Sequence, residues 1–313
     1  MTGSNNRIML AVTLALAPGL VVLSWFYGWG YVQNLAIALP MAYAADLVCL
    51  RLRRGGSGAR RAGGTARQQG GAFDASILLG ALILALALPP GMPWHVLAVA
   101  TFGMIVLARQ LYGGLGHNVF NPAMVGYVLA LVCFPAALAA WPPLVDGHTG
   151  ATALTEFRYR EGLTSAEVFA ANPAFGQFGG HGWEWANLAF ACGGVVAAGL
   201  GLLAWRVVLS FLIVLGVLAL LFYDGGSSRS AGSPLFHYLS AGTMLAAFFV
   251  VTDPVTHPGH PLGQWLFGAL VAGIAFAIRA WGGYPDGIAF GVLIANAASP
   301  FLDALCRRRV RAP

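Results

Sequence analysis

The sequence contains no lysine and few charged residues of any kind. Charged residues make up 9% of its 313 positions, and all 17 basic residues are arginine. Soluble domains carry roughly 25% charged residues, so an ordinary soluble protein is excluded. Hydrophobic residues make up 58%, and the mean hydropathy is +0.73. A chain of this length cannot bury so much apolar surface in its own core, and we therefore expect lipid to cover much of it.

Cysteine is scarce as well, and its spacing excludes two kinds of site. The four cysteines are scattered along the apolar stretches, with no C-x-x-C pair. This pattern fits neither a disulfide framework nor an iron–sulfur cluster. His257 and His260 lie in a Pro/Gly turn without further ligands, so no metal site is predicted. No nucleic-acid partner is expected, because the net charge of +6 comes from arginines bunched at the ends of apolar segments.

Long apolar runs fill most of the chain. A membrane-spanning helix needs roughly 20 apolar residues. Runs near that length occur at 8–27, 33–50, 74–90, 94–112, 120–140, 185–205, 207–223, 235–252, 263–281 and 284–305. The first run is followed at once by another, which is typical of a retained span and not of a cleaved signal. The predicted fold class is therefore an all-α polytopic membrane protein with about ten transmembrane helices.

The placement of arginine predicts how these spans are oriented. Cytoplasmic loops of membrane proteins carry an excess of Arg and Lys. With the N-terminus in the cytoplasm, most arginines fall on the cytoplasmic side. The exceptions are Arg158, Arg160, Arg229 and Arg279. We therefore predict a multi-pass membrane protein with both termini in the cytoplasm, a cytoplasmic loop at 51–73 and a loop on the outer side at 141–184, which in a bacterial inner membrane is the periplasmic side.

A short pattern recurs in the two halves of the chain. Arg109-Gln-Leu-Tyr-Gly-Gly is similar to Arg279-Ala-Trp-Gly-Gly, and each follows one apolar span and opens the next. Five predicted spans precede the periplasmic loop and five follow it, so a second half of the same fold would be inverted in the membrane. We predict two inverted five-helix halves, 1–140 and 185–313. The alternative is chance similarity, because the chain holds 42 glycines.

The most specific short motif lies in the predicted periplasmic loop. It reads Thr149-Gly150-Ala151-Thr152. From the residues alone, it is equally a turn in which Thr149 or Thr152 caps a short helix. The motif also resembles the flavinylation sequence S/T-G-A-T of the NqrB/RnfD family, in which the last threonine forms a phosphoester with FMN. The resemblance implies covalent FMN on Thr152, with Thr149, Gly150 and Ala151 forming the attachment site.

The resemblance to this family covers nearly the whole chain. Residues 113–127 look like its G-G-x-G-x-N-x-F-N-P-A motif, and 252–256 and 282–303 look like two further hallmark blocks. Within the family the chain is most similar to the RnfD branch. Asn118 and Asn121 of the first block are implied as cofactor-binding residues. A second, non-covalent flavin of the riboflavin type is allowed by analogy, and the residues do not decide it.

Two acids lie near predicted helix breaks in the second half. Asp253 precedes a proline after an apolar span, and Asp286 lies in Gly-Gly-Tyr-Pro-Asp-Gly. Ionisable groups at membrane depth are costly and typically mark ion or proton paths, so both are candidates for an ion path. The alternatives are that Asp253 caps a half-helix and that Asp286 pairs with Arg279. Asp46 and Asp74 lie near cytoplasmic span ends and are expected at the membrane interface.

The resemblance implies a function in electron transport. It implies a subunit of the Rnf complex, an ion-translocating oxidoreductase that relays electrons between ferredoxin and NAD and moves Na⁺ or H⁺. The chain has neither a Gly-rich nucleotide fingerprint nor a cysteine cluster, so NAD, iron–sulfur and further flavin sites are expected on partner subunits. No catalytic side chain is predicted. The alternatives are an NqrB-type subunit of a Na⁺-translocating NADH:quinone reductase and a small-solute channel or transporter without a redox role.

Overall fold

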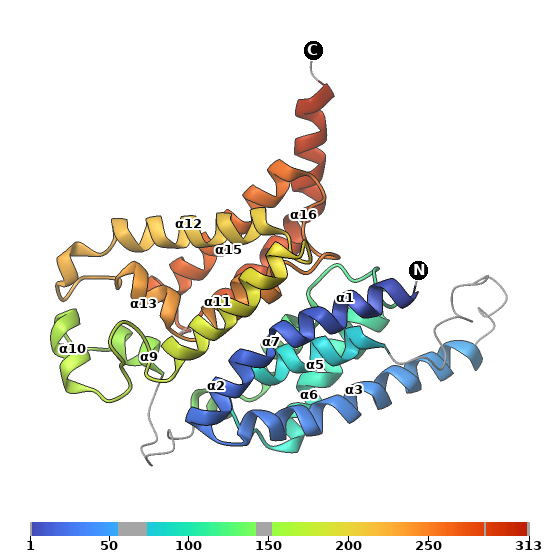
Figure 1. Cartoon of the computed structure of the whole chain (residues 1–313), viewed down its shortest axis with the longest axis horizontal. Helices are drawn as coiled ribbons and strands as arrows, with labels where there is room; N and C mark the ends of the chain where they lie inside the picture. Colours follow the sequence, from blue (N-terminus) through green and yellow to red (C-terminus); the bar gives the residue numbers. More distant parts are fainter. Residues whose placement is uncertain (1, 56–73, 142–151, 285, 312–313) are drawn as a thin grey trace.

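The structure is a computed structural model that describes residues 2–55, 74–141, 152–284 and 286–311 (Figure 1). Helices dominate these residues, and the only β-pairing among them is an isolated bridge between Phe175 and Gly180. This confirms the predicted all-helical polytopic fold. The motif residues Thr149, Gly150 and Ala151 lie outside the described residues.

The first half of the chain consists of α-helices with one π-helical segment. Its elements are α1 (Thr2–Ala15), α2 (Ala17–Tyr27), α3 (Gly30–Gly55), α5 (Ala75–Ala87), α6 (Trp94–Phe102), the π-helical η2 (Gly103–Gln110) and α7 (Pro122–Cys133). The short α8 (Pro135–Ala139) follows α7 directly. A π-helical segment inside a membrane helix commonly lies near a functional site, because the extra residue per turn redirects side chains.

The second half begins after two short helices and also contains a π-helical segment. The short helices are α9 (Ala153–Arg158) and α10 (Ser165–Ala171). The elements that follow are α11 (Trp183–Gly199), α12 (Trp205–Leu221), η3 (Asp224–Gly226), α13 (Pro234–Leu239), α14 (Thr243–Leu245), the π-helical η4 (Ala246–Val250), α15 (Pro261–Trp281) and α16 (Ile288–Arg311). Each of the predicted apolar runs therefore overlaps at least one helix.

Some of the predicted spans are continuous helices and others are broken. The described helices long and apolar enough to cross a membrane are Asn5–Tyr27, Gly30–Arg53, Pro261–Trp281 and Ile288–Arg307. Shorter apolar helices cover four further runs. The run at 235–252 is divided among α13, α14 and η4. Proline favours such breaks because it has no backbone N–H, and the helices α7, α13 and α15 each begin with one.

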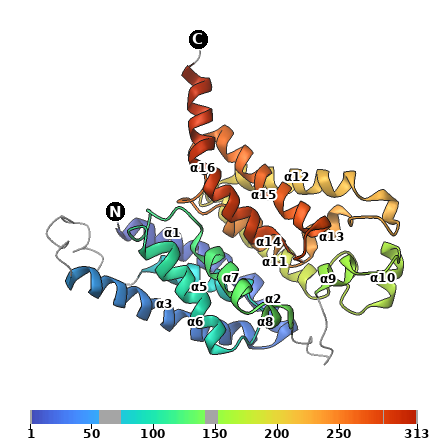
Figure 2. The same ribbon diagram turned by 180° about the vertical axis from the view of Figure 1, so that it is seen from behind.

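The two halves form two lobes with matching internal packing (Figures 1 and 2). In the first lobe α3 packs against α6, and in the second α12 packs against α15. The lobes meet where α2 contacts α11 and where α7 contacts α16. In Figure 1, α11 runs opposite to α1 and α2. The assignment of the lobes to inverted repeats stays a prediction.

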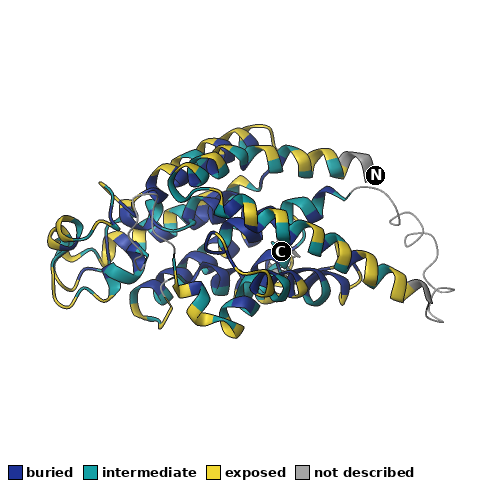
Figure 3. Ribbon diagram, turned by 90° about the horizontal axis from the view of Figure 1, so that it is seen from below, coloured by how far each residue is buried: buried dark blue, intermediate teal, exposed yellow. Residues whose placement is uncertain are grey.

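Small residues bring the two lobes close together. A side chain added at Gly193 of α11 would collide with the carbonyl oxygen of Ala15, and one added at Gly19 of α2 would collide with the ring of Phe190. Membrane helices lack a hydrophobic driving force between them, so close van der Waals packing at small residues holds them together. Figure 3 shows the buried residues along the middle of the molecule, with exposed residues on the outer helix faces.

Two glycines of α15 provide a test of this packing. A Cβ at Gly268 would lie 2.5 Å from the carbonyl oxygen of Val207 on α12, whereas a Cβ at Gly273 has no atom within 4 Å. We expect Gly268→Ala to destabilise the protein by about 1–3 kcal/mol through overpacking. Gly273→Ala should be neutral or stabilising by up to about 1 kcal/mol, since alanine favours helix. Thermal unfolding of both variants in one detergent checks this, and a Gly268→Ala protein that melts no lower than Gly273→Ala would contradict it.

Candidate functional site

Two cavities lie between the lobes, and each contains residues that the sequence singled out. We call the first the asparagine cavity. It has a volume of about 110 Å³ and is lined among others by Met9, Leu79, Arg109, Asn118, Asn121 and Asp253. We call the second the tryptophan cavity. It has a volume of about 300 Å³ and is lined among others by Tyr127, Trp141, Thr152, Trp183, Tyr284 and Asp286.

Asn121 is the most extensively bonded residue of the asparagine cavity. Its side chain caps α7 by accepting from the amide of Met124 at 3.2 Å, and its Nδ2 donates to the carbonyl of Val250 at 3.2 Å. Its own amide donates to Oδ1 of Asn296 on α16 at 2.9 Å. Asn121 is only 4% exposed. It therefore joins the start of α7 to two elements of the other lobe.

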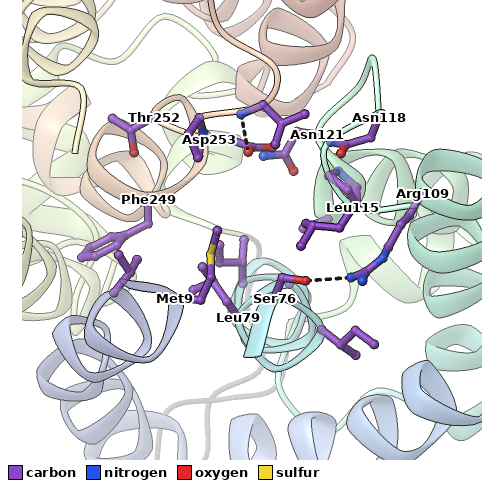
Figure 4. A pocket seen from close by; sticks show the side chains of 18 of the residues that line it. Met9, Ser76, Leu79, Arg109, Leu115, Asn118, Asn121, Phe249, Thr252 and Asp253 are labelled. Carbon is purple, nitrogen blue, oxygen red and sulfur yellow. Dashed lines mark hydrogen bonds between the residues drawn. The ribbon is translucent and has the colours of Figure 1, made fainter. Parts of the chain in front are cut away.

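The asparagine cavity combines polar and apolar side chains, and the polar Ser76 lies beside Leu79 (Figure 4). Figure 4 shows Asn118, Asn121 and Asp253 along one side and Met9 and Leu79 across from them. Asn118 is buried, and its Nδ2 donates to the carbonyl of Phe120 at 3.2 Å. A cavity of this character suits a ligand with an apolar face and a few polar edge groups.

Asp253 lies in a turn between η4 and α15. Its Oδ1 accepts from the amide of Val255 at 3.2 Å, so it stabilises the turn and does not cap a half-helix, which was the alternative interpretation. No arginine or histidine of the described residues lies within ion-pair distance of its carboxylate. A carboxylate on a cavity wall without an ion-pair partner is unusual within a membrane protein. Its assignment to an ion path stays a prediction.

Asp286 is held differently. Its Oδ1 lies 3.1 Å from Nε of Arg279 and also accepts from the amide of Ile288 at the start of α16. The pairing with Arg279, which the sequence allowed as an alternative, is therefore present. Asp286 lines the tryptophan cavity and not the asparagine cavity. The structure thus separates the two acids that the sequence grouped together.

Arg279 is also bonded to the elements before η4. Its Nη2 donates to Oγ1 of Thr243 at 2.9 Å, and its Nη1 donates to the carbonyl of His237 at 3.1 Å. Arg109, the other arginine of the repeated pattern, donates to Oγ of Ser76 at 2.9 Å and pairs with Asp74 at 2.5 Å. Both arginines thus bind a hydroxyl near the start of a preceding helix in their own lobe.

The network around Arg109 includes both acids that the sequence predicts at the membrane interface, Asp46 and Asp74. Asp46 is only 8% exposed and accepts from Nε2 of Gln110 at 2.5 Å. Nε of Arg109 lies 3.8 Å from Asp46. A buried guanidinium needs carboxylate partners, and these acids supply them. In the sequence Arg109 served as a topology marker and as part of the repeated pattern, and its recurrence as Arg279 was a signal for a structural role.

Thr152 lies at the edge of the tryptophan cavity. It is the N-cap of α9, and its Oγ1 accepts from the amide of Thr155 at 3.4 Å and lies 3.0 Å from the hydroxyl of Thr155. The helix-cap interpretation of the motif is therefore confirmed for Thr152. The residue is half-buried and contributes to the cavity wall.

Four aromatic side chains, Tyr127, Trp141, Trp183 and Tyr284, contribute to a wall that is otherwise mostly aliphatic. The rings of Trp141 and Trp183 lie edge to face with centroids 6.0 Å apart, and Tyr27 contacts both of them. Tyr127 and Tyr284 line the same cavity. Both belong to blocks that resemble the family, but neither could be assigned a role from the sequence, because their meeting depends on how the two lobes pack. An aromatic cavity of this size is suited to a planar ring system.

The two cavities are separated by elements that they share. Phe249 of η4 lines the asparagine cavity, whereas Ala246 and Val250 of the same segment line the tryptophan cavity. In α7, Ala123 lines the asparagine cavity and Met124 lines the tryptophan cavity. The cavities therefore follow one another along the interface between the lobes.

Comparison with known proteins supports the family resemblance. Residues 2–311 match the model of the NQR2, RnfD, RnfE family. The chain is 43% identical to the D component of the ion-translocating oxidoreductase complex of Ectopseudomonas mendocina, over 98% of this chain and 92% of that protein. It is 44% identical to the same component from Pseudomonas aeruginosa, again over 98% of this chain and 92% of that protein. It is 38% identical to the component from Cellvibrio japonicus, over 96% of this chain and 90% of that protein. The match extends over both lobes, and the chain belongs to the NQR2, RnfD, RnfE family.

Proposed function

We propose that this protein is a membrane subunit of an ion-translocating oxidoreductase complex of the Rnf type and carries FMN covalently on Thr152. The complex would pass electrons between ferredoxin and NAD and couple this transfer to movement of Na⁺ or H⁺. The names of the relatives support the general function. The single observation that carries the cofactor assignment is the Thr152 hydroxyl, which ends an S/T-G-A-T motif and lies at a 300 Å³ aromatic cavity.

The local bonding of Thr152 is compatible with a phosphoester. Esterification removes the hydroxyl proton of Thr152 but leaves an oxygen that accepts hydrogen bonds. The amide of Thr155 can therefore keep its bond to this oxygen, and the Thr155 hydroxyl can donate in place of accepting. Attachment of FMN thus preserves the cap of α9. The bound flavin would supply one-electron chemistry, and the protein would orient its ring and tune its potential.

The aromatic wall is the means by which the chain would orient the ring. Trp141 and Trp183 provide flat apolar faces, while the carboxylate of Asp286 is the charged group of the cavity. Asp286 is held by Arg279 on one side and by the amide of Ile288 on the other. A carboxylate fixed in this way contributes a constant local field, which would influence the potential of a nearby flavin.

A second flavin fits the asparagine cavity in chemistry but not in size. Its amide groups and apolar wall suit a riboflavin ring. Its volume of about 110 Å³, however, is well below the roughly 300 Å³ or more of typical ligand pockets. Binding of riboflavin there would require the lobes to move apart at η2 and η4. The proposed function therefore includes no step through a second flavin.

The proposed orientation follows from the arginine pattern. α9 and α10 lie at the end of the molecule opposite to the N-terminus (Figure 1). With both termini in the cytoplasm of a bacterial cell, Thr152 would face the periplasm across the inner membrane. Ferredoxin, NAD and iron–sulfur sites would belong to partner subunits, since the chain lacks their sequence motifs. The redox function is favoured over a solute channel because the relatives are named as components of an oxidoreductase.

Substitution of Thr152 tests the covalent flavin. We expect Thr152→Ala, expressed with the flavin transferase, to lose the flavin fluorescence band that remains after denaturing electrophoresis. Alanine also removes the cap of α9, at a cost of about 1 kcal/mol. Thr152→Asn separates the two effects, because asparagine caps helices well but cannot form the phosphoester. Thr152→Ser should keep both the cap and the flavin.

The readouts for these variants are in-gel fluorescence and the mass of the peptide that contains the motif, each normalised to protein in the membrane. Loss of the flavin in both Thr152→Ala and Thr152→Asn, with normal amounts of protein, is the expected result. An unmodified wild-type peptide from an active complex would end the proposal.

Asp253 tests the coupling to ion movement. Asp253→Asn keeps an oxygen that can accept from the amide of Val255 but removes the charge at the asparagine cavity. We expect ion pumping in inverted vesicles to fall by about tenfold, equivalent to about 1.4 kcal/mol in a barrier, with membrane insertion unchanged. Asp224→Asn, at an exposed acid outside both cavities, is the matched control. Unchanged pumping with normal assembly of the complex would remove Asp253 from the ion path.

A further inference from the structure

A third cavity gathers the four arginines that depart from the predicted charge distribution. We call it the arginine cavity. It has a volume of about 220 Å³ and lies between α9, α13, the end of α15 and the loop after α12. The arginines that line it are Arg158, Arg160, Arg229 and Arg279. These are the same residues that the orientation places on the periplasmic side, where basic residues are disfavoured in short loops.

The charges in this cavity are largely uncompensated. No Asp or Glu of the described residues lines it. Arg279 has Asp286 as a partner, but Asp286 lies outside the arginine cavity. Arg158 donates through Nη1 to the carbonyls of Ile278 and Arg279 at 3.4 and 3.0 Å. Since arginine stays protonated in proteins, the cavity is strongly positive.

The other two arginines differ in how firmly they are held. Arg160 donates to carbonyl oxygens that include those of Phe157 at 2.6 Å and Ser230 at 2.5 Å, so its position is fixed. The side chain of Arg229 is exposed and has no hydrogen bond or ion pair within the described part of the chain. The cavity thus combines one pre-positioned guanidinium with groups whose donors are available. Guanidinium groups bind phosphate oxygens through paired N–H donors.

A buried histidine also lies on the wall of the cavity. His237 lines the cavity and is only 1% exposed. Its Nε2 lies 2.9 Å from the carbonyl oxygen of Ala231, whereas its Nδ1 has no hydrogen-bond partner among the described residues. Because a carbonyl oxygen only accepts, Nε2 donates to it and Nδ1 carries a lone pair, so this histidine does not itself bind a phosphate oxygen.

The rim of the cavity indicates the source of such a phosphate group. Phe222 and Trp281 line the cavity, with 43% and 61% of their surfaces exposed, and Leu221 beside them is 71% exposed. Exposed aromatic residues at the end of membrane helices typically lie at the level of lipid headgroups. A ligand with a phosphate group and apolar chains satisfies both the cationic cavity and this rim.

We propose that the arginine cavity binds a phosphate oxyanion, and that the headgroup of an anionic phospholipid is the source that its rim favours. The phosphodiester would accept from Arg158 and Arg229, and the acyl chains would lie along the exposed apolar surface at the end of α12. This site is separate from the proposed flavin site, because Thr152 lines the tryptophan cavity and not this one. It also explains why four arginines remain on the side where the general charge pattern disfavours them.

The test uses the full-length protein in nanodiscs made of equal parts of phosphatidylcholine and phosphatidylglycerol. Native mass spectrometry measures the phosphatidylglycerol that stays bound after release from the disc. We expect wild type to retain it and Arg158→Gln and Arg229→Gln each to reduce retention by about tenfold. Arg206→Gln, at the other end of α12, is the matched control and should bind like wild type. Because the Arg229 side chain makes no hydrogen bond or ion pair within the described residues, its variant should remain folded.

A second arm distinguishes a lipid headgroup from free phosphate. Melting temperatures are measured for protein in nanodiscs of pure phosphatidylcholine. One set is measured in phosphate buffer and the other in a chloride buffer of equal ionic strength. Phosphate could raise the melting temperature of wild type, and raise it less in Arg229→Gln, while no phosphatidylglycerol is retained. That result would support the site and identify the free anion as its ligand. Equal lipid retention and equal phosphate response in wild type and variants would overturn the proposal. The proposal would also be overturned if Arg229→Gln lost a partner subunit and the wild-type protein bound neither phosphate nor lipid. That outcome would indicate that the cavity binds an acidic surface of a partner protein.

Discussion

The hydrogen bonds of Asn121 hold the two lobes together at a point where membrane helices break. Lipid cannot satisfy a backbone group that a broken helix leaves unpaired, and each such group left unpaired costs several kcal/mol. The Asn121 side chain caps α7 and donates to the carbonyl of Val250 at the end of η4, and its backbone amide donates to Asn296. The cavities exist beside these breaks because the broken elements leave space that continuous helices would fill.

Two arginines give the lobes a common internal arrangement. Arg109 and Arg279 each follow an apolar helix, each bind a hydroxyl near the start of an earlier helix and each pair with aspartate. Their surroundings differ. Arg109 lines the asparagine cavity, whereas Arg279 lines the arginine cavity and holds Asp286 at the tryptophan cavity. A single ion pair therefore joins the proposed flavin site to the proposed phosphate site.

Much of the fold was predictable, because apolar run length and proline placement act locally. The breaks within 235–252 were not, since its composition is largely apolar and only tertiary hydrogen bonds distinguish α13, α14 and η4. For the site, the family motifs implied Thr152 and Asn121, and the position of Asp253 near a predicted helix break singled it out. Tyr284 could not be assigned a role, because a single tyrosine carries no signal of the cavity that it lines.

The sequence by itself determined that the chain is helical, membrane-embedded and a member of its family, since hydropathy, arginine placement and motifs depend on residue type and order. Only the tertiary structure decided which polar groups share a cavity. It separated Asp253 from Asp286 and brought Arg158, Arg160, Arg229 and Arg279 together. The physical reason is that most of these groups lie far apart along the chain, and their distances depend on how helices pack at small residues, which local composition does not encode.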